Sequence, residues 1–232
     1  MLARATDVSL DRFPHQAMTF FDDLLAVLTW AGVAVFAAAG ALTASRKQLD
    51  PVGFILIAAV TAFGGGTVRD VILNLPVFWL QAPGMVLLAA GVALMVYFTA
   101  HLVERRFSVL LWSDAVGMGL FAVLGAEAAL RAGASSWVAV LMGTITATFG
   151  GILRDIICAE LPLMLRREIY ATAAAAGAAI YVVLNIAGTS RDIAISAGAI
   201  GGFLIRAEAI RRGWSLPAYR ARPGRDYPDR RS

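Results

Sequence analysis

The chain has 232 residues, of which 59% are hydrophobic and only 16% are charged, with a formal net charge of +4 and a mean hydropathy of +0.72. Soluble domains are roughly 45–50% apolar and about 25% charged, and a soluble chain of this size could not bury so much apolar surface behind so few charges. The composition therefore excludes an ordinary soluble enzyme, a disordered protein and a nucleic-acid reader, and it predicts an integral membrane protein.

Seven apolar stretches follow one another along the chain, each close to the ~20 residues that a helix needs to cross a bilayer. They are not the strands of a membrane barrel, which are ~10 residues long and alternate in polarity. We therefore predict an all-α integral membrane protein with seven transmembrane helices. The predicted spans are Leu24–Ala44, Val52–Leu73, Gly84–Val103, Val109–Leu130, Trp137–Cys158, Glu168–Ala187 and Asp192–Ile210.

Pairs of basic residues follow the first, third, fifth and seventh spans, whereas the alternate loops hold few. Lys and Arg favour the cytoplasmic side of short loops, so we expect the amino terminus outside the cytoplasm and the carboxyl terminus inside it. Residues 1–22 would then form an extracytoplasmic tail. Residues 213–232 would form a basic, disordered cytoplasmic tail that orients the chain or contacts anionic membrane lipid, with no nucleic-acid partner.

A ten-residue motif occurs twice, as TAFGGGTVRD (61–70) and TATFGGILRD (146–155), at an offset of about 85 residues. The first three spans (23–107) match the next three (108–188), and the seventh (189–212) stands outside the repeat. Because three is an odd number, the second unit enters the membrane from the opposite face. This predicts a 3+3 inverted repeat, as in transporters and some channels; an old duplication kept only for packing is the alternative. Upstream, Gly32, Phe36 and Gly40 match Gly117, Phe121 and Gly125.

Runs of glycine lie near the middle of the second and fifth spans. Glycine weakens a helix by ~1 kcal/mol per residue relative to alanine, so consecutive glycines favour a kink. Backbone groups freed at that depth need protein burial or an aqueous cavity. We therefore expect kinked second and fifth helices with a hinge or pore constriction there, and close helix contact is the alternative. The candidate residues are Gly64, Gly65, Gly66, Gly150 and Gly151.

Each motif ends in an Arg-Asp pair, Arg69-Asp70 and Arg154-Asp155, inside the predicted membrane. Ionisable groups there cost a few kcal/mol or more and usually face a cavity or a partner. Because adjacent residues on a helix point about 100° apart, we expect neither pair to close on itself. Depth along the helices predicts that Arg69 pairs with Glu127 of the fourth span. Equal depth also predicts that Arg154 pairs with Asp114; snorkelling arginines are the alternative.

Catalytic and metal-binding patterns are not found in the sequence. The two histidines, His15 and His101, are far apart, and Cys158 is the single cysteine, which excludes an intrachain disulfide framework and leaves it without a partner for a metal site. We therefore expect a protein that is not an enzyme and that holds no cofactor or metal.

The repeated glycine run, followed each time by Arg-Asp and then by a proline, resembles the bacterial relatives of the trimeric intracellular cation channels, a family also labelled "glycine transporter". The resemblance covers residues 22–212. It implies a homotrimer in the bacterial inner membrane, with one pore inside each protomer that conducts potassium and sodium and favours potassium weakly. It also implies that the glycines and Arg-Asp pairs of the two motifs line the two halves of that pore. The basic lipid-binding motif that animal members carry on the second helix is not found here.

Two functions remain open. The resemblance implies a passive cation channel, whereas the inverted repeat alone favours a secondary transporter of a small solute such as glycine. A non-conducting scaffold explains the repeated intramembrane charges least well. In a channel, the two arginines would repel cations unless nearby carboxylates neutralise them or they point away from the ion path.

Overall fold

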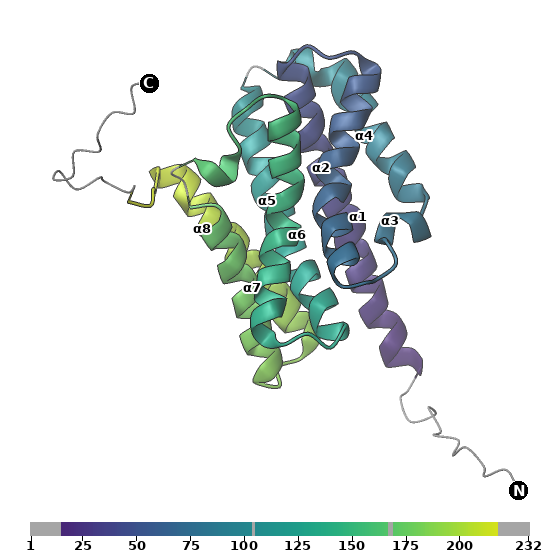
Figure 1. Ribbon diagram of the computed structural model, residues 1–232, viewed down its shortest axis with the longest axis vertical. Coiled ribbons are helices and arrows are strands. Elements are labelled where there is room, and N and C mark those ends of the chain that lie inside the picture. Colours follow the sequence, from purple (N-terminus) through teal and green to yellow (C-terminus); the bar gives the residue numbers. More distant parts are fainter. Residues whose placement is uncertain (1–14, 104, 167–168, 218–232) are drawn as a thin grey trace, which may run out of the picture.

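The structure is a computed structural model that describes residues 15–103, 105–166 and 169–217, with side chains from Leu24 onward. Most of the two predicted tails lies outside these residues, although the first helix already begins at His15. The long helices are α1 (His15–Arg46), α2 (Pro51–Ile72), α4 (Gly84–Thr99), α5 (Arg106–Arg131), α6 (Ser136–Ile157), α7 (Ala171–Ile186) and α8 (Arg191–Arg212) (Figure 1). The short elements are α3 (Phe78–Gln81) and the 3-10 turns η1 (Ala100–Leu102) and η2 (Leu163–Leu165).

Six of the described helices are long and apolar enough to cross a membrane. They correspond to the first five predicted spans and the seventh, and they confirm the all-α membrane fold. The sixth predicted span, Glu168–Ala187, is shorter in the structure, because α7 has only 16 residues and is therefore about 24 Å long. The chain before it forms the turn η2, and Tyr170 is buried at the start of α7 instead of extending the helix.

The same turn ends α2 and α6. Asn74 after α2 and Ala159 after α6 adopt left-handed φ angles of 53° and 50°. In each case the amide of the following residue then donates a hydrogen bond at 2.8 Å to the carbonyl of the motif's aspartate, Asp70 or Asp155. Such left-handed residues commonly close helix ends. Here they turn the chain back over the aspartate at the equivalent point of both units.

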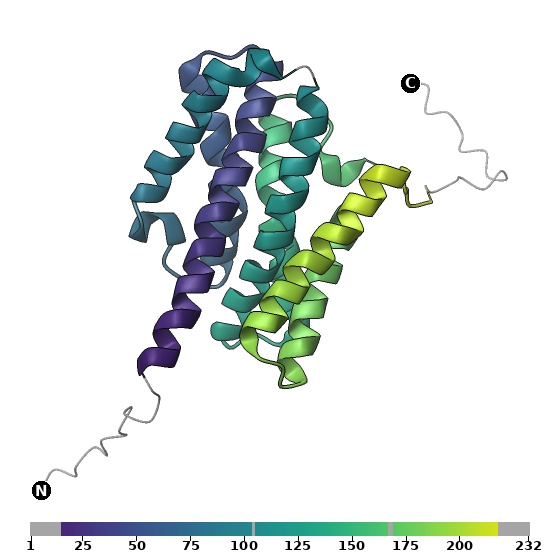
Figure 2. The ribbon, with the colours of Figure 1, turned by 180° about the vertical axis from the view of Figure 1, so that it is seen from behind.

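The first two helices of each unit form the centre of the bundle. α1 and α6 each pack against α2 and α5, while α4 lies against α1 and α2, and α7 lies against α5 and α6. α8 packs against α5 and α7. Figure 2 shows that α5 begins at the end of the bundle opposite to the start of α1, as an inverted repeat requires.

The two units contact each other reciprocally. Phe36 of α1 and Phe121 of α5 stack with 5.1 Å between ring centroids and 9° between planes. The ring of Phe121 lies over Gly32, and the ring of Phe36 lies over Gly117. These are the residues that match in sequence, so the inverted repeat is present in the packing as an approximate twofold symmetry.

α2 and α6 cross at the two glycine runs. A Cβ atom on Gly65 would overlap the carbonyl oxygen of Thr146, and one on Gly150 would overlap the carbonyl oxygen of Thr61. Small residues allow membrane helices to approach this closely. Both helices are α-helical throughout the runs. Close packing, the alternative interpretation of these glycines, thus has direct structural support, and the kink stays a prediction.

Candidate functional site

The first Arg-Asp pair is buried near the carboxyl end of α2. Arg69 Nε donates to Asp70 Oδ1 at 2.8 Å, and Arg69 Nη2 lies 2.7 Å from the same oxygen. The other carboxylate oxygen accepts a hydrogen bond from the Phe78 amide at 2.9 Å, and the guanidinium carbon lies 5.7 Å from the Phe78 ring centroid. Asp70 therefore both neutralises Arg69 and holds the segment that leads into α3.

The second pair repeats this geometry near the end of α6. Arg154 Nε donates to Asp155 Oδ1 at 2.8 Å, and Asp155 Oδ2 accepts from the Leu163 amide at 2.9 Å. The expectation that neither pair closes on itself is therefore wrong. The helix separates the two Cβ directions, but the arginine side chain is long enough to curve back to its neighbour's short carboxylate.

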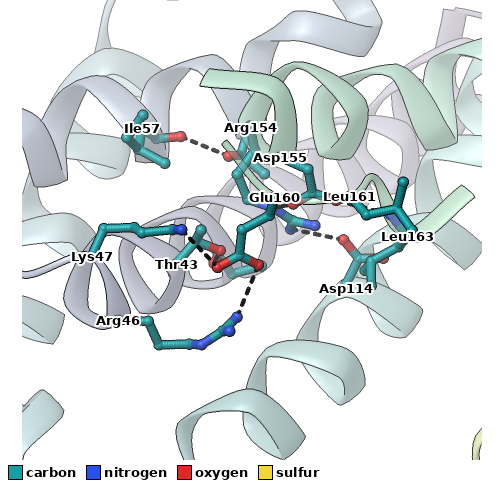
Figure 3. Close-up of polar contacts among 12 residues, drawn as sticks. Thr43, Arg46, Lys47, Ile57, Asp114, Arg154, Asp155, Glu160, Leu161 and Leu163 are labelled. Atoms are coloured by element: carbon teal, nitrogen blue, oxygen red, sulfur yellow. Dashed lines mark hydrogen bonds and ion pairs between the residues drawn. The ribbon is translucent and has the colours of Figure 1, made fainter. Parts of the chain in front are cut away.

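Arg154 has a second carboxylate partner, as depth along the helices predicted. Its Nη1 lies 3.0 Å from Oδ1 of Asp114 on α5 (Figure 3), and the two side chains are 0% and 1% exposed. Thr29 occupies the equivalent position of the first unit. Arg154 is therefore held by two carboxylates and Arg69 by one.

Glu127, the predicted partner of Arg69, binds other residues. It accepts a hydrogen bond from Arg131 Nε at 2.7 Å and also contacts the Arg191 guanidinium and the Tyr181 hydroxyl. The predicted Arg69–Glu127 ion pair is thus wrong, because depth along a helix gives the level of a side chain in the membrane and not the direction in which it points. Glu127 instead ties α5 to α7 and α8.

Arg69 and Glu127 nevertheless line the same cavity. Its volume is 170 Å³, and residues of α1, α2, α3 and α5 surround it. Because its lining includes charged groups and it has room for several water molecules, we expect it to be hydrated. Its other lining residues include Thr29, Phe78, Phe121, Leu124 and Arg131.

A third buried arginine escaped the sequence analysis. Arg206 of α8 is 1% exposed; its Nη1 donates to the carbonyl of Ile169 at 3.0 Å, and its guanidinium carbon lies 5.1 Å from the Tyr170 ring centroid. An arginine inside the predicted seventh span was a visible signal. It belongs to neither copy of the repeated motif from which the functional charges were predicted.

Glu160 joins the ends of α6 and α1. Its carboxylate lies 3.2 Å from Arg46 Nη1 and 3.4 Å from Lys47 Nζ (Figure 3). The Arg46 guanidinium carbon also lies 4.8 Å from the ring centroid of Phe107 on α5. These basic residues, which in the sequence indicate only the orientation of the chain, also connect the two repeat units. We call Glu160, Arg46 and Lys47 the inter-unit clasp.

The site combines the two buried motif arginines, each neutralised by at least one carboxylate, with a neighbouring cavity. Pairing offsets the penalty of burying a charge away from water. Within residues 15–103, 105–166 and 169–217, no group of three or more His, Cys, Asp or Glu side chains is arranged to hold a metal ion. This arrangement suits the passage of a small solute or ion.

Comparison with protein families gives a matching model, described as "Glycine transporter". It matches twice, over residues 26–101 and 111–185. The first match covers the unit from α1 to α4, and the second covers the unit from α5 to α7.

Curated relatives cover most of the chain. A UPF0126 membrane protein of Vibrio cholerae is 38% identical over 202 residues, which are 84% of this chain and 83% of the relative. The UPF0126 inner membrane protein YadS of Escherichia coli is 37% identical over 194 residues, which are 81% and 92% of the two chains.

Solved structures with the same fold are ion channels rather than enzymes. The TRIC trimeric intracellular cation channel orthologue from Rhodobacter sphaeroides is 50% identical, with a TM-score of 0.80 and coverage of 82% of this chain and 99% of that one. A prokaryotic TRIC channel solved in 0.5 M KCl is 29% identical, with a TM-score of 0.80 over 84% of this chain and 100% of that one.

Proposed function

The chain belongs to the TRIC channel family, whose sequence model is described as "Glycine transporter", and from this membership we propose that it is a channel for monovalent cations. The observation that carries the proposal is the match to the Rhodobacter sphaeroides TRIC orthologue, at 50% identity over 99% of that chain. The likeness covers 82% of this chain, and the family model matches both repeat units.

The channel we propose conducts potassium and sodium through a pore within each protomer of a homotrimer. Its two halves are lined by the glycine runs of α2 and α6 and by the charged pairs beside them. Support comes from the equivalent geometry of the two motifs and from the 170 Å³ cavity on which Arg69 opens. The proposed pore and gating residues are Gly64, Gly65, Gly66, Arg69, Asp70, Gly150, Gly151, Arg154 and Asp155.

Neutralised arginines are compatible with cation passage. Asp70 compensates Arg69, and Asp155 together with Asp114 compensates Arg154. A ring or pair of bare arginines would select for anions. With these carboxylates in place, the fixed charge beside the proposed path no longer repels cations.

We place the protein in the bacterial inner membrane, with the amino terminus outside and the carboxyl terminus in the cytoplasm. The Escherichia coli relative is named an inner membrane protein, and the basic loops support the orientation. In this topology the units 23–107 and 108–188 face opposite sides, 189–212 adds the last span, and the inter-unit clasp lies at the cytoplasmic end.

A secondary transporter of a small solute such as glycine is the second candidate. The inverted repeat favours it, because this architecture is frequent among transporters that alternate access around a central site. The family description names glycine as well. A transporter would couple the solute to a gradient, whereas a channel needs no coupling.

Ion flux in liposomes separates the two. Purified protein is reconstituted into vesicles loaded with KCl, and potassium release and uptake of labelled glycine are measured side by side, with protein-free vesicles as the control. The channel predicts potassium release that scales with the gradient and no concentrative glycine uptake. Saturable, gradient-driven glycine uptake without potassium release would establish the transporter, and neither flux would indicate a scaffold.

A further inference from the structure

The second motif contains polar atoms that lack partners although they are buried. Arg154 uses Nε for Asp155 and Nη1 for Asp114, which leaves its Nη2 without a hydrogen-bond partner among the described residues. Oδ2 of Asp114 and the hydroxyl of Tyr170 are also buried and unpartnered within that part of the chain. The three side chains are at most 1% exposed, so bulk water does not reach them. Buried polar groups in this condition usually bind an ordered water.

Gly151 supplies the space that these groups share. A Cβ atom at this position would lie 3.3 Å from the Tyr170 hydroxyl, 3.5 Å from Arg154 Nη2 and 3.5 Å from Asp114 Oδ1. Three polar side chains from α5, α6 and the start of α7 therefore converge on the open face of one glycine.

A side chain fills the equivalent place in the first unit. Gly66 matches Gly151 in the repeat, and the ring of Phe78 occupies the space over it. In the second unit Leu163 stands at the position of Phe78, Tyr170 at that of Met85, and Asp114 at that of Thr29. The polar site is thus a property of the second unit and not of the shared backbone.

We propose that one structural water molecule sits over Gly151 and bridges Arg154, Asp114 and Tyr170. It accepts a hydrogen bond from Arg154 Nη2, donates one to Asp114 Oδ2, and exchanges one with the Tyr170 hydroxyl, which can donate or accept. A cation in this place would meet the guanidinium, and an anion would meet the carboxylate. Only a ligand that both donates and accepts satisfies all three groups.

The bridge connects the second motif to α8. The Tyr170 ring lies under the Arg206 guanidinium of α8, which donates to the carbonyl of Ile169. Through the water, a change at Arg154 reaches Tyr170 and then the helix that lies outside the repeat. The inference stands on these contacts and does not depend on whether the protein is a channel or a transporter.

A high-resolution crystal structure of the full chain in lipid tests the site directly. We expect a single spherical density peak about 2.7–3.2 Å from Arg154 Nη2, Asp114 Oδ2 and the Tyr170 hydroxyl. A direct hydrogen bond from Tyr170 to Asp114 with no density between them would overturn the proposal, as would an anomalous peak that identifies an ion.

A double-mutant cycle gives an independent test by thermal unfolding. Tyr170→Phe removes the hydroxyl, Gly151→Ala fills the space, and each should lower the midpoint temperature by a few degrees. If both remove the same bridge, the double variant loses less than the sum of the two. Because Tyr170→Phe also removes the oxygen that the new methyl group would touch at 3.3 Å, this coupling supports the water only together with the density peak. The control combines Tyr170→Phe with Gly91→Ala, whose added methyl meets no atom within 4 Å, and its effects should add. Additive losses in the Gly151 cycle would contradict the shared water.

Discussion

The carboxylates of Asp70 and Asp155 each perform two tasks. One oxygen holds the preceding arginine, and the other accepts an amide from the segment that returns after the helix, at 2.9 Å in both units. The charge and the fold of the returning segment therefore depend on the same side chain. This explains in physical terms why Arg, Asp and the following turn recur together in both motifs.

Loss of Arg154 should destabilise the protein more than loss of Arg69. Arg154→Met leaves two buried carboxylates, Asp114 and Asp155, without their cation, whereas Arg69→Met leaves only Asp70. Breaking a buried ion pair costs about 3–5 kcal/mol. Thermal unfolding in detergent should show the larger loss for Arg154→Met, and an equal or larger loss for Arg69→Met would contradict the assigned partners.

Conductance should respond to the charge of Arg69. This arginine lines the 170 Å³ cavity, so Arg69→Gln would leave Asp70 uncompensated and raise the local concentration of cations. Single-channel recordings should show a higher unitary cation conductance for Arg69→Gln at low salt, and a smaller difference at high salt because charge is screened. Unchanged unitary currents in a folded Arg69→Gln variant would remove Arg69 from the ion path.

Sequence alone predicted one of the two inter-helix ion pairs. Arg154–Asp114 was found because the two residues share a level in the membrane and also happen to face each other. Arg69–Glu127 share a level as well, but Arg131, Arg191 and Tyr181 reach the Glu127 carboxylate. Which side chain reaches a carboxylate depends on helix rotation and on rotamers, and neither is encoded in the spacing of residues along one helix.

At the level of the helices, the close crossing of α2 and α6 leaves no room for a larger side chain in either glycine run. At Gly65 and at Gly150 the nearest atoms are backbone carbonyls of the partner helix, which cannot move aside as a side chain does.

Gly65→Ala and Gly150→Ala should therefore each cost about 1–3 kcal/mol or more, as overpacking does. Gly91→Ala on α4, whose methyl group would face open space, is the matched control and should be neutral or slightly stabilising. Size-exclusion profiles and thermal unfolding of the three variants provide the measurement. If the crossing variants behave like the control, α2 and α6 do not approach each other as described.

The inter-unit clasp should contribute little and be sensitive to salt. Its side chains are partly exposed, at 30% for Arg46, 34% for Lys47 and 13% for Glu160, and such pairs contribute about 1 kcal/mol or less. Glu160→Gln should lower the unfolding temperature at low salt, and the difference should shrink in 1 M KCl. Glu208→Gln, which removes an i,i+4 pair within α8, controls for the loss of one carboxylate. A loss for Glu160→Gln that persists in 1 M KCl would mean that the clasp is not mainly electrostatic.

The lengths of the apolar stretches predicted the helices well, because the thickness of the bilayer sets the length that a membrane-spanning helix needs. Six long apolar helices follow from that constraint alone. The short α7 does not, because the apolar pattern runs on through Ile169 and Tyr170, and only the fold shows that Tyr170 turns inward to Arg206. The four-residue helix α3 is likewise too short to leave a periodic signal.

On the scale of the whole molecule, the two units share a backbone but differ in charge. The second unit carries Asp114, Tyr170 and Glu160, where the first has Thr29, Met85 and Leu75. Arg154 is consequently enclosed by polar side chains, whereas Arg69 lines a cavity. The repeat and its inversion were predictable from sequence, whereas this structural difference between the halves required the contacts.

Single-channel recording under a KCl gradient shows whether the protein conducts cations. Purified protein is incorporated into a planar lipid bilayer with a higher KCl concentration on one side, and the reversal potential of the unitary currents is measured. A cation channel predicts discrete currents that reverse close to the potassium equilibrium potential. Folded, incorporated protein that gives no discrete currents, or currents that reverse at the chloride potential, would contradict the account.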